Sequence, residues 1–174
     1  QLFLTDYAFF QPEEISSPYL EFDTLDATFQ WKVRTAYDSM LDDDYFYVPD
    51  QVFGLNSNPS NTYYGYAQFD FQVTEENNYA ILAHCLPNGG GNNSFWVQLI
   101  TNNIESPYYY WNMDISRSWY WDAVNNNSAA TDPLVFYLLP GVDYSLKFIP
   151  REDGTKINKI RIINKNYYTI NIHQ

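Results

Sequence analysis

Apolar and polar side chains alternate along the middle of the chain with the two-residue period of a half-buried β-strand. Between Tyr66 and Val73, the residues that share one predicted face are Ala67, Phe69, Phe71 and Val73. The residues predicted to point the other way include Gln68, Asp70 and Gln72. Because successive side chains of a strand face opposite ways, this segment predicts a strand with one buried face and one wet face.

Short segments of similar character recur to the end of the chain. The predicted strands are 79–85, 94–100, 108–111, 119–124, 134–139, 144–149, 157–163 and 168–172. Turn-forming residues separate several of them, as in Pro87–Asn93, Pro140-Gly141 and Arg151–Gly154. Helical periodicity is weak, and its best candidate is a turn near Tyr37–Leu41. The pattern predicts an all-β antiparallel sandwich or barrel, and no linker or repeat divides the single predicted domain, residues 1–174.

Composition narrows the range of partners. The net charge is −12, with 9 basic against 21 acidic residues. A nucleic-acid binder needs the opposite balance to neutralise phosphates, and an anionic membrane surface is disfavoured for the same reason. Aromatic residues make up 20% of the chain, and 17 of them are tyrosines, which suit wet surfaces that recognise polar, ring-shaped ligands. A neutral glycan is therefore the favoured partner.

Residues for catalysis are few. His84 lies between apolar neighbours, which is typical of a core residue, and His173 is next to the chain end. Cys85 is the only cysteine, so no intrachain disulfide forms, and its apolar surroundings indicate a small core residue. Paired carboxylates, as in glycosidases, are the one open catalytic route, but acidic runs are usually solvated turns. We expect no enzyme activity.

The densest chemical signal is aromatic. Tyr108–Trp111 and Trp119–Trp121 flank the polar stretch Asn112–Ser118. A sugar ring packs its C–H face on an aromatic plane while its hydroxyls need directed polar partners, and this neighbourhood supplies both. The alternative is that two tryptophans at i and i+2 share a sheet face and fill the core. We expect one or two of the three tryptophans to be core residues.

Several motifs in this order resemble known carbohydrate-binding modules. The segments that carry the resemblance are Tyr66–Val73, Asn92–Gln98, Trp111-Asn112, Trp119–Val124, Leu134–Gly141 and Arg151–Ile160. Together they are similar to the non-catalytic modules of families 6, 35 and 16 and to malectin-like domains. The resemblance covers about Tyr63 to Asn164 and implies a two-sheet β-sandwich of the jelly-roll type.

The resemblance also implies a structural calcium. Gln11 and Glu13 stand where these modules often carry an acidic pair that helps to hold the ion. Calcium takes carboxylate oxygens, and Asp43 in the run Asp42–Asp44 is a second candidate ligand. Asn158 stands where the closing hairpin often carries Asp, and an amide can coordinate or can hydrogen-bond a sugar hydroxyl.

The resemblance places a ligand among the loops at one end of the sandwich, or alternatively on a sheet face. Trp119 matches the later of two aromatics that flank the sugar, with Trp111 or Tyr110 beside it and Trp121 deeper. Candidates for the earlier aromatic are Tyr45, Tyr47, Tyr63 and Tyr64. Asn92, Asn93 and Asn158 are the predicted hydrogen-bonding residues.

The expected function is thus non-catalytic binding of a poly- or oligosaccharide by a secreted or cell-surface module. Such modules are commonly tethered to a catalytic or surface domain. Two alternatives stay open at this point: a jelly-roll polysaccharide lyase or glycosidase, and an adhesive β-sandwich that binds protein.

Overall fold

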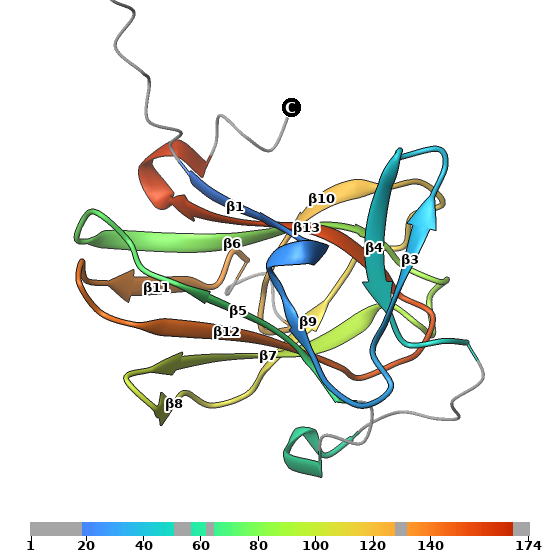
Figure 1. Ribbon diagram of the computed structural model, residues 1–174, viewed down its shortest axis with the longest axis horizontal. Helices are drawn as coiled ribbons and strands as arrows, with labels where there is room; N and C mark the ends of the chain where they lie inside the picture. The colour runs from blue at the N-terminus through green and yellow to red at the C-terminus, as the bar shows by residue number, and fades with distance from the viewer. Residues whose placement is uncertain (1–18, 51–56, 62–64, 128–131, 169–174) are drawn as a thin grey trace, which may run out of the picture.

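The computed structural model describes residues 19–50, 57–61, 65–127 and 132–168, and it is an antiparallel two-sheet β-sandwich of the jelly-roll type. In Figure 1, strands β1, β13 and β6 form the upper layer and β5, β12 and β7 the lower layer. The fold predicted from the sequence is confirmed. No helix among the described residues is long and apolar enough to cross a membrane.

The first sheet has seven strands, of which five run in the order β10-β6-β13-β4-β3, while β1 pairs with β13 and β11 with β6. Its strands are β1 (Tyr19–Asp23), β3 (Arg34–Asp38), β4 (Asp43–Tyr47), β6 (Asn77–Leu86), β10 (Tyr120–Ala123), β11 (Val135–Leu138) and β13 (Lys156–Asn164). The long strands β6 and β13 lie at its centre, and β3 lies at an edge next to β4.

The second sheet has six strands. Five of them run in the order β2-β5-β12-β7-β8, and the sixth, β9, pairs with β7. Its strands are β2 (Thr28–Phe29), β5 (Ala67–Phe71), β7 (Ser94–Thr101), β8 (Ile104–Glu105), β9 (Tyr109–Asn112) and β12 (Tyr144–Pro150). Three short 3-10 helices complete the described elements: η1 (Thr24–Asp26), η2 (Pro59–Asn61) and η4 (Lys165–Tyr167).

The core lies between the sheets and is rich in aromatic rings. The largest fully buried side chains include Trp111, Phe46, Phe69, Phe95 and Phe148. Phe69 meets Phe148 edge-on at 6.1 Å between ring centroids, a geometry that aromatic pairs favour. Both come from the second sheet, whereas Phe46 comes from β4 of the first, so these rings join the two layers.

The predicted strands between 66 and 163 are present, with small shifts at their ends. The Tyr37–Leu41 segment is not a helical turn: Tyr37 lies in β3, and the Asp38 carboxylate accepts hydrogen bonds from the backbone N–H groups of Met40 and Leu41 in a β-hairpin. After β13 the chain forms η4 rather than a strand at Tyr168, and residues 169–172 lie outside the described part.

Loops that are distant in sequence meet at one end of the sandwich. The turn after β12 is fastened there because the backbone N–H of Gly154 donates to the carbonyl of Val48 (2.8 Å). Gly154 has φ +78°, and a Cβ at this position would approach the Asn88 side chain to 2.4 Å, so glycine is required. The loop 87–93 therefore packs against the turn 151–155.

Candidate functional site

A cluster of aromatic side chains covers part of the outer face of the seven-stranded sheet. Ala83 and Cys85 point into the core, so His84 between them points outward. By the same alternation Phe46 is buried, while Tyr45 and Tyr47 lie on the outer face. Trp121 pairs directly with His84, and Trp119 precedes β10 by one residue, so the strand order brings all of these side chains together.

Trp119 is the centre of this cluster. Its ring stacks on the imidazole of His84 with centroids 5.4 Å apart and an interplanar angle of 25°. It also contacts Tyr45 at 5.8 Å with a tilt of 56°, and Tyr45 in turn contacts Tyr47 at 5.2 Å. Each of these four rings is half-buried, so each keeps some surface in water. We call Trp119, His84, Tyr45 and Tyr47 the aromatic strip.

Charged groups border the aromatic strip. The indole N–H of Trp119 donates to Oδ2 of Asp38 on β3 (3.2 Å). Hydrogen bonds from the Met40 backbone N–H and from Trp119 lower the pKa of the Asp38 carboxyl below its ordinary value. The ammonium group of Lys156 lies over the ring of Tyr45 at 4.9 Å from its centroid. The strip thus offers ring faces beside a hydrogen-bond acceptor and a donor.

Asn158 lies beneath the strip and positions His84. The register of β13 against β6 shifts between Ile157 and Lys159, so Asn158 occupies a β-bulge. Its amide nitrogen donates to Asp43 Oδ2 (3.1 Å), and its Oδ1 lies 2.5 Å from Nδ1 of His84. Because the amide oxygen can only accept, His84 carries a proton on Nδ1. At 2% exposure Asn158 supports the strip and does not itself reach a ligand.

The protonation state of His84 follows from its surroundings. Burial lowers the pKa of the imidazole, and the neighbouring cations Lys159 and Arg161 lower it further, whereas the hydrogen bond to Asn158 opposes the shift. His84 is therefore neutral near pH 7, with Nε2 left as a hydrogen-bond acceptor. The sequence-based interpretation of His84 as a core residue is wrong, since the residue lies on the outer face of β6.

Trp121 lies on the same face as Trp119, as alternation predicts, but it is half-buried rather than in the core. His84 contacts its ring at 5.1 Å, and the guanidinium of Arg161 covers it at 4.1 Å. Glu21 on β1 accepts a hydrogen bond from Nε of Arg161 (2.7 Å) and so holds that cation in place. Trp121 therefore lies next to His84 at one end of the strip, with its ring covered by Arg161.

The other predicted aromatics lie elsewhere, because β9 belongs to the second sheet while β10 belongs to the first. Trp111 is in the core with 0% exposure, and its indole N–H donates to Asp122 Oδ2 (2.8 Å), so no ring face is available for a ligand. Tyr110 contacts Trp96 at 5.4 Å on the second sheet and lies under the guanidinium of Arg151 (4.2 Å). Neither residue stands beside Trp119.

The two predicted loop asparagines are placed differently from one another. The side chain of Asn93 is buried and donates to the carbonyl of Met113 (2.6 Å), which ties two loops together rather than facing a ligand. Asn92 is half-buried, and its carbonyl accepts a hydrogen bond from Thr155 Oγ1 (2.5 Å) at the loop end of the sandwich. Of the two, Asn92 keeps the more accessible side chain.

Of the two predicted metal ligands, Asp43 lies within the described residues and Glu13 does not. Gln11 also lies outside the described residues, as do the candidate aromatics Tyr63 and Tyr64. Asp43 accepts hydrogen bonds from Asn158 and from the Asp44 backbone N–H, and Lys159 Nζ lies 3.8 Å from its Oδ2. Within the described ranges, no group of three or more His, Cys, Asp or Glu side chains could hold a metal ion. Among the described residues, Asp43 is therefore engaged by an amide and by a lysine.

Sequence reasoning missed the roles of His84 and Lys156 and left Tyr45 as one of four candidates. The signal for His84 was the strand period, because position 84 lies between Ala83 and Cys85, whose side chains point into the core. No local signal identifies Tyr45, because its contact with Trp119 depends on the order of strands in the sheet.

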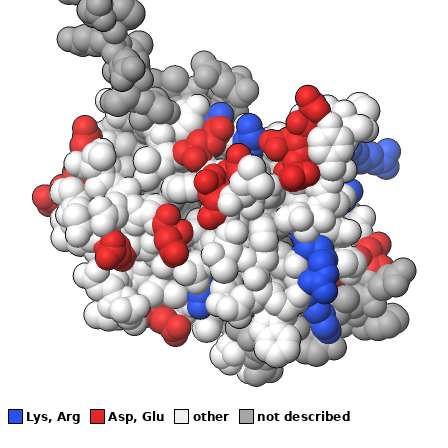
Figure 2. Space-filling model, viewed as in Figure 1, with Lys and Arg blue, Asp and Glu red and all other residues white. Residues whose placement is uncertain are grey.

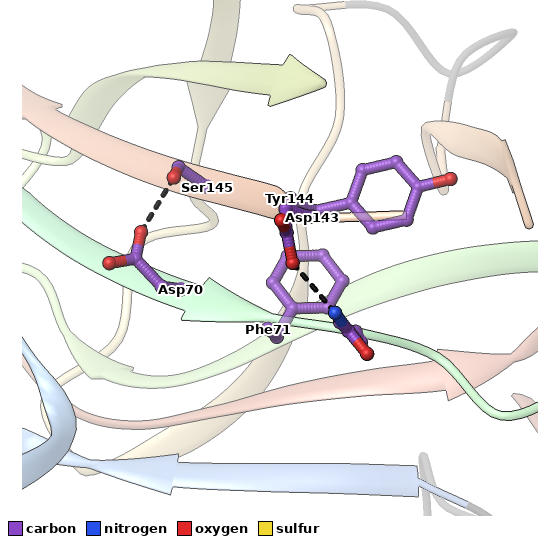
Figure 3. Close-up of a pocket in the computed structure, with 6 residues that line it drawn as sticks. Asp70, Phe71, Asp143, Tyr144 and Ser145 are labelled. Carbon is purple, nitrogen blue, oxygen red and sulfur yellow. Dashed lines mark hydrogen bonds between the residues drawn. The ribbon is translucent and has the colours of Figure 1, made fainter. Parts of the chain in front are cut away.

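A cavity of about 450 Å³ lies away from the strip, on the second sheet. It is lined by Asp70, Phe71, Gln72, Asp143, Tyr144 and Ser145 (Figure 3). Its polar side chains bind one another: Ser145 Oγ donates to Asp70 (2.6 Å) and Gln72 Nε2 donates to Asp143 (2.6 Å). Phe71 lies opposite Tyr144 there, at the end of β5 that is far from the turn 151–155.

The surface charge is unevenly distributed. Figure 2 shows acidic side chains spread over the visible face, while the basic ones gather mainly toward its right-hand side. Three of the 9 basic residues, Lys156, Lys159 and Arg161, belong to β13 and border the aromatic strip and Trp121. The acidic chain thus places cations next to its exposed aromatic rings.

No model of a known protein family matches the chain, and no curated protein matches it in sequence. Solved structures do share its fold. A family 35 carbohydrate-binding module from Clostridium thermocellum matches with a TM-score of 0.54 and 14% identity, over 83% of this chain and 98% of that one. A carbohydrate-binding module from Cellvibrio mixtus lichenase 5A, in complex with cellotriose, matches with a TM-score of 0.54 and 10% identity, over 84% and 97%.

A third similar structure belongs to a longer protein. The β-(1,4)-mannanase of Podospora anserina, which joins a family 26 glycoside hydrolase to a family 35 module, matches with a TM-score of 0.53 and 9% identity. The match covers 84% of this chain but 28% of that one. At such identities the likeness establishes the fold, and function has to be argued from the site.

Proposed function

We propose that this protein is a non-catalytic carbohydrate-binding module that holds an oligo- or polysaccharide on the aromatic strip. The observation that carries the proposal is the contact between Trp119 and Tyr45, two half-exposed rings 5.8 Å apart on the outer face of the sheet. A soluble protein rarely gathers such apolar surface without a partner for it.

The chemistry of the strip suits a sugar. A pyranose ring packs its C–H face on an aromatic plane, which Trp119 and Tyr45 provide. Sugar hydroxyls both donate and accept hydrogen bonds. The strip itself contains the neutral imidazole of His84, and it is bordered by the Asp38 carboxylate and the Lys156 ammonium group. Trp119 is the principal stacking residue in this proposal, and Asn92 is a further candidate for a polar contact at the loop end.

The fold neighbours support the proposal and suggest probes. The Cellvibrio mixtus module was solved with cellotriose, and the Podospora anserina enzyme is a β-(1,4)-mannanase. Cello-oligosaccharides and manno-oligosaccharides are therefore the first ligands to test. By the same analogy we propose that the domain works outside the cell, tethered to a catalytic or surface domain. Calcium binding through Glu13 and Asp43 stays a prediction, for which a higher melting temperature in calcium than in EDTA is the test.

The decisive experiment replaces Trp119 by alanine and measures binding to the trisaccharides and hexasaccharides of both series by isothermal titration calorimetry. Loss of a stacking ring should weaken binding by about 2 kcal/mol or more, as for other aromatic anchors. The melting temperature should change little, because Trp119 is half-exposed and lies outside the core.

The matched control is Trp111→Ala, which removes the same side chain from the core. Truncating a buried tryptophan costs about 3–5 kcal/mol of folding stability. Trp111→Ala should therefore lower the melting temperature strongly. If Trp119→Ala binds each sugar as tightly as the unmodified protein, the aromatic strip is not the site.

A further inference from the structure

Trp31 is an exposed tryptophan that does not belong to the aromatic strip. It lies in the turn between β2 and β3, and 72% of its surface is exposed. Its backbone has φ +59°, in the left-handed region that a bulky residue rarely adopts. Such strain persists where the surrounding structure enforces it, and it is concentrated at binding sites.

The turn that presents Trp31 is held from several sides. The backbone N–H of Gln30 donates to the Tyr66 carbonyl (3.0 Å), and Gly65 packs directly against the turn. A Cβ at position 65 would lie 1.9 Å from the Gln30 carbonyl oxygen, so only glycine allows this approach. Nη1 of Arg34 donates to the carbonyls of Trp31 and Val33. The indole is thus displayed from a fixed backbone.

Trp31 is connected to the aromatic strip by neighbouring residues. Arg34 lies directly opposite Tyr47 in the pairing of β3 with β4. Tyr47 is the outer member of the strip and leads through Tyr45 to Trp119. Starting from Trp119, ring contacts lead to Tyr45 and Tyr47, strand pairing leads on to Arg34, and the Arg34 guanidinium binds the backbone of the turn that carries Trp31.

This arrangement points to a ligand longer than the strip alone can hold. Trp119 and Trp31 come from separate turns at the two ends of this series of contacts, and both present indole surface to water. The Arg34 guanidinium uses Nη1 to hold the turn, and its Nε and Nη2 are N–H donors of the kind that sugar hydroxyls accept. One short sugar would use only the Trp119 end of the series.

Resting on the proposed function, we infer that the site binds an extended stretch of a polysaccharide chain and that Trp31 is the stacking residue for its far end. The strip holds one part of the chain, and Trp31 holds sugar units several positions further along. Affinity should consequently rise with chain length, and Trp31 should contribute only to the longer ligands.

The test compares a trisaccharide with a hexasaccharide in the cello and manno series, using calorimetry on the full chain. The informative variant is Trp31→Asn, because asparagine tolerates the left-handed backbone and so removes the ring without disturbing the turn. The unmodified protein should bind the hexasaccharide more tightly than the trisaccharide. Trp31→Asn should weaken hexasaccharide binding about tenfold, the equivalent of about 1.4 kcal/mol for one lost stacking contact, and should leave trisaccharide binding within about twofold.

Ile104→Ala is the matched control, because Ile104 is 73% exposed and lies on β8 of the other sheet. It should affect neither ligand. If Trp31→Asn binds the hexasaccharide as tightly as the unmodified protein while Trp119→Ala still weakens binding, this inference is overturned and the proposed function stands. An equal loss for both ligands would also overturn the inference, because Trp31 would then not be confined to the far end. Failure of the unmodified protein to bind any of these sugars would reject both proposals.

Discussion

At the scale of single residues, two tryptophans use the same chemical group in opposite settings. Trp119 donates its indole N–H to Asp38 on the surface, and Trp111 donates to Asp122 at the edge of the core. An indole N–H requires an acceptor when it is covered, and a carboxylate is the strongest available. In the Trp119–Asp38 pair the carboxylate stays in water, whereas in the Trp111–Asp122 pair the carboxyl group lies in an apolar environment.

The buried carboxylate makes stability depend on pH. Burial raises the pKa of Asp122 from 3.8 to about 7; the hydrogen bond from Trp111 opposes this shift, and the nearby charges of Asp132 and Asp114 add to it. Between these two pH values the folded state keeps a proton that the unfolded state releases. The contribution of Asp122 to stability is therefore fully present below pH 4 and is lost as the pH rises to about 7.

Asp122→Asn should remove this dependence, because its amide oxygen still accepts from Trp111 and carries no charge. We expect the variant to be more stable than the unmodified protein at pH 8, on the order of 1 kcal/mol or more, and about equal to it at pH 4. Denaturant titrations at the two pH values measure both differences. A variant less stable than the unmodified protein at pH 8 would show that the carboxylate is needed in its charged form.

At the scale of elements, β13 joins the core to the proposed site. Its apolar residues Ile157, Ile160 and Ile162 are buried, and Lys159 and Arg161 face outward. The bulge at Asn158 turns an extra polar side chain under the sheet surface, where it binds His84 of β6 and Asp43 of β4. One amide therefore connects three strands directly beneath Trp119.

Asn158→Ala should weaken this connection. It leaves the His84 N–H and the Asp43 carboxylate without their buried partner, which costs about 1–3 kcal/mol of stability. Because His84 is then free to turn away from Trp119, binding of the hexasaccharide should fall as well. The control is Asn78→Ala on the exposed side of β6, which should change neither property. Thermal unfolding and calorimetry report the two effects separately, and unaltered binding by Asn158→Ala would contradict the positioning role.

The strands also show what the sequence could and could not predict. β5 was predictable because Ala67, Phe69 and Phe71 form one strict apolar face. β3 and β4 carry no such face, because β3 is largely exposed and β4 begins with two aspartates. They lie at one edge of the sheet, where a strand needs less apolar surface, so the apolar pattern did not predict them. The full set of site residues could not be predicted either, because it depends on the order of strands in the sheet. Local alternation placed Trp119 and Trp121 on one face, but only strand order separates Tyr110 from Trp119 and brings Tyr45 to it.

At the scale of the whole molecule, several of the described groups that could take part in chemistry are engaged or buried. Cys85 is in the core, where burial raises the pKa of its thiol well above the ordinary value. His84 binds Asn158, and the carboxylates Asp70 and Asp143 in the cavity bind Ser145 and Gln72. These contacts favour binding over turnover.

We therefore expect no depolymerisation of cello- or manno-oligosaccharides by the isolated chain. Incubation with the hexasaccharides should release no new reducing ends above a heat-treated control. Release that persists after repurification, and that disappears in Asp70→Asn or Asp143→Asn, would instead identify an enzyme with its reaction centre in the cavity rather than on the strip.

The graded burial of the tryptophans gives the protein its own optical reporters. Trp111 is sealed in the core, Trp119 stacks on an imidazole, and Trp31 stands in water. Their indoles should thus emit at different wavelengths and differ in access to a soluble quencher such as acrylamide. A sugar that docks on the strip should shield Trp119 first, and a longer chain should shield Trp31 as well. Trp111 should stay constant, an internal reference against which occupancy can be read without any label.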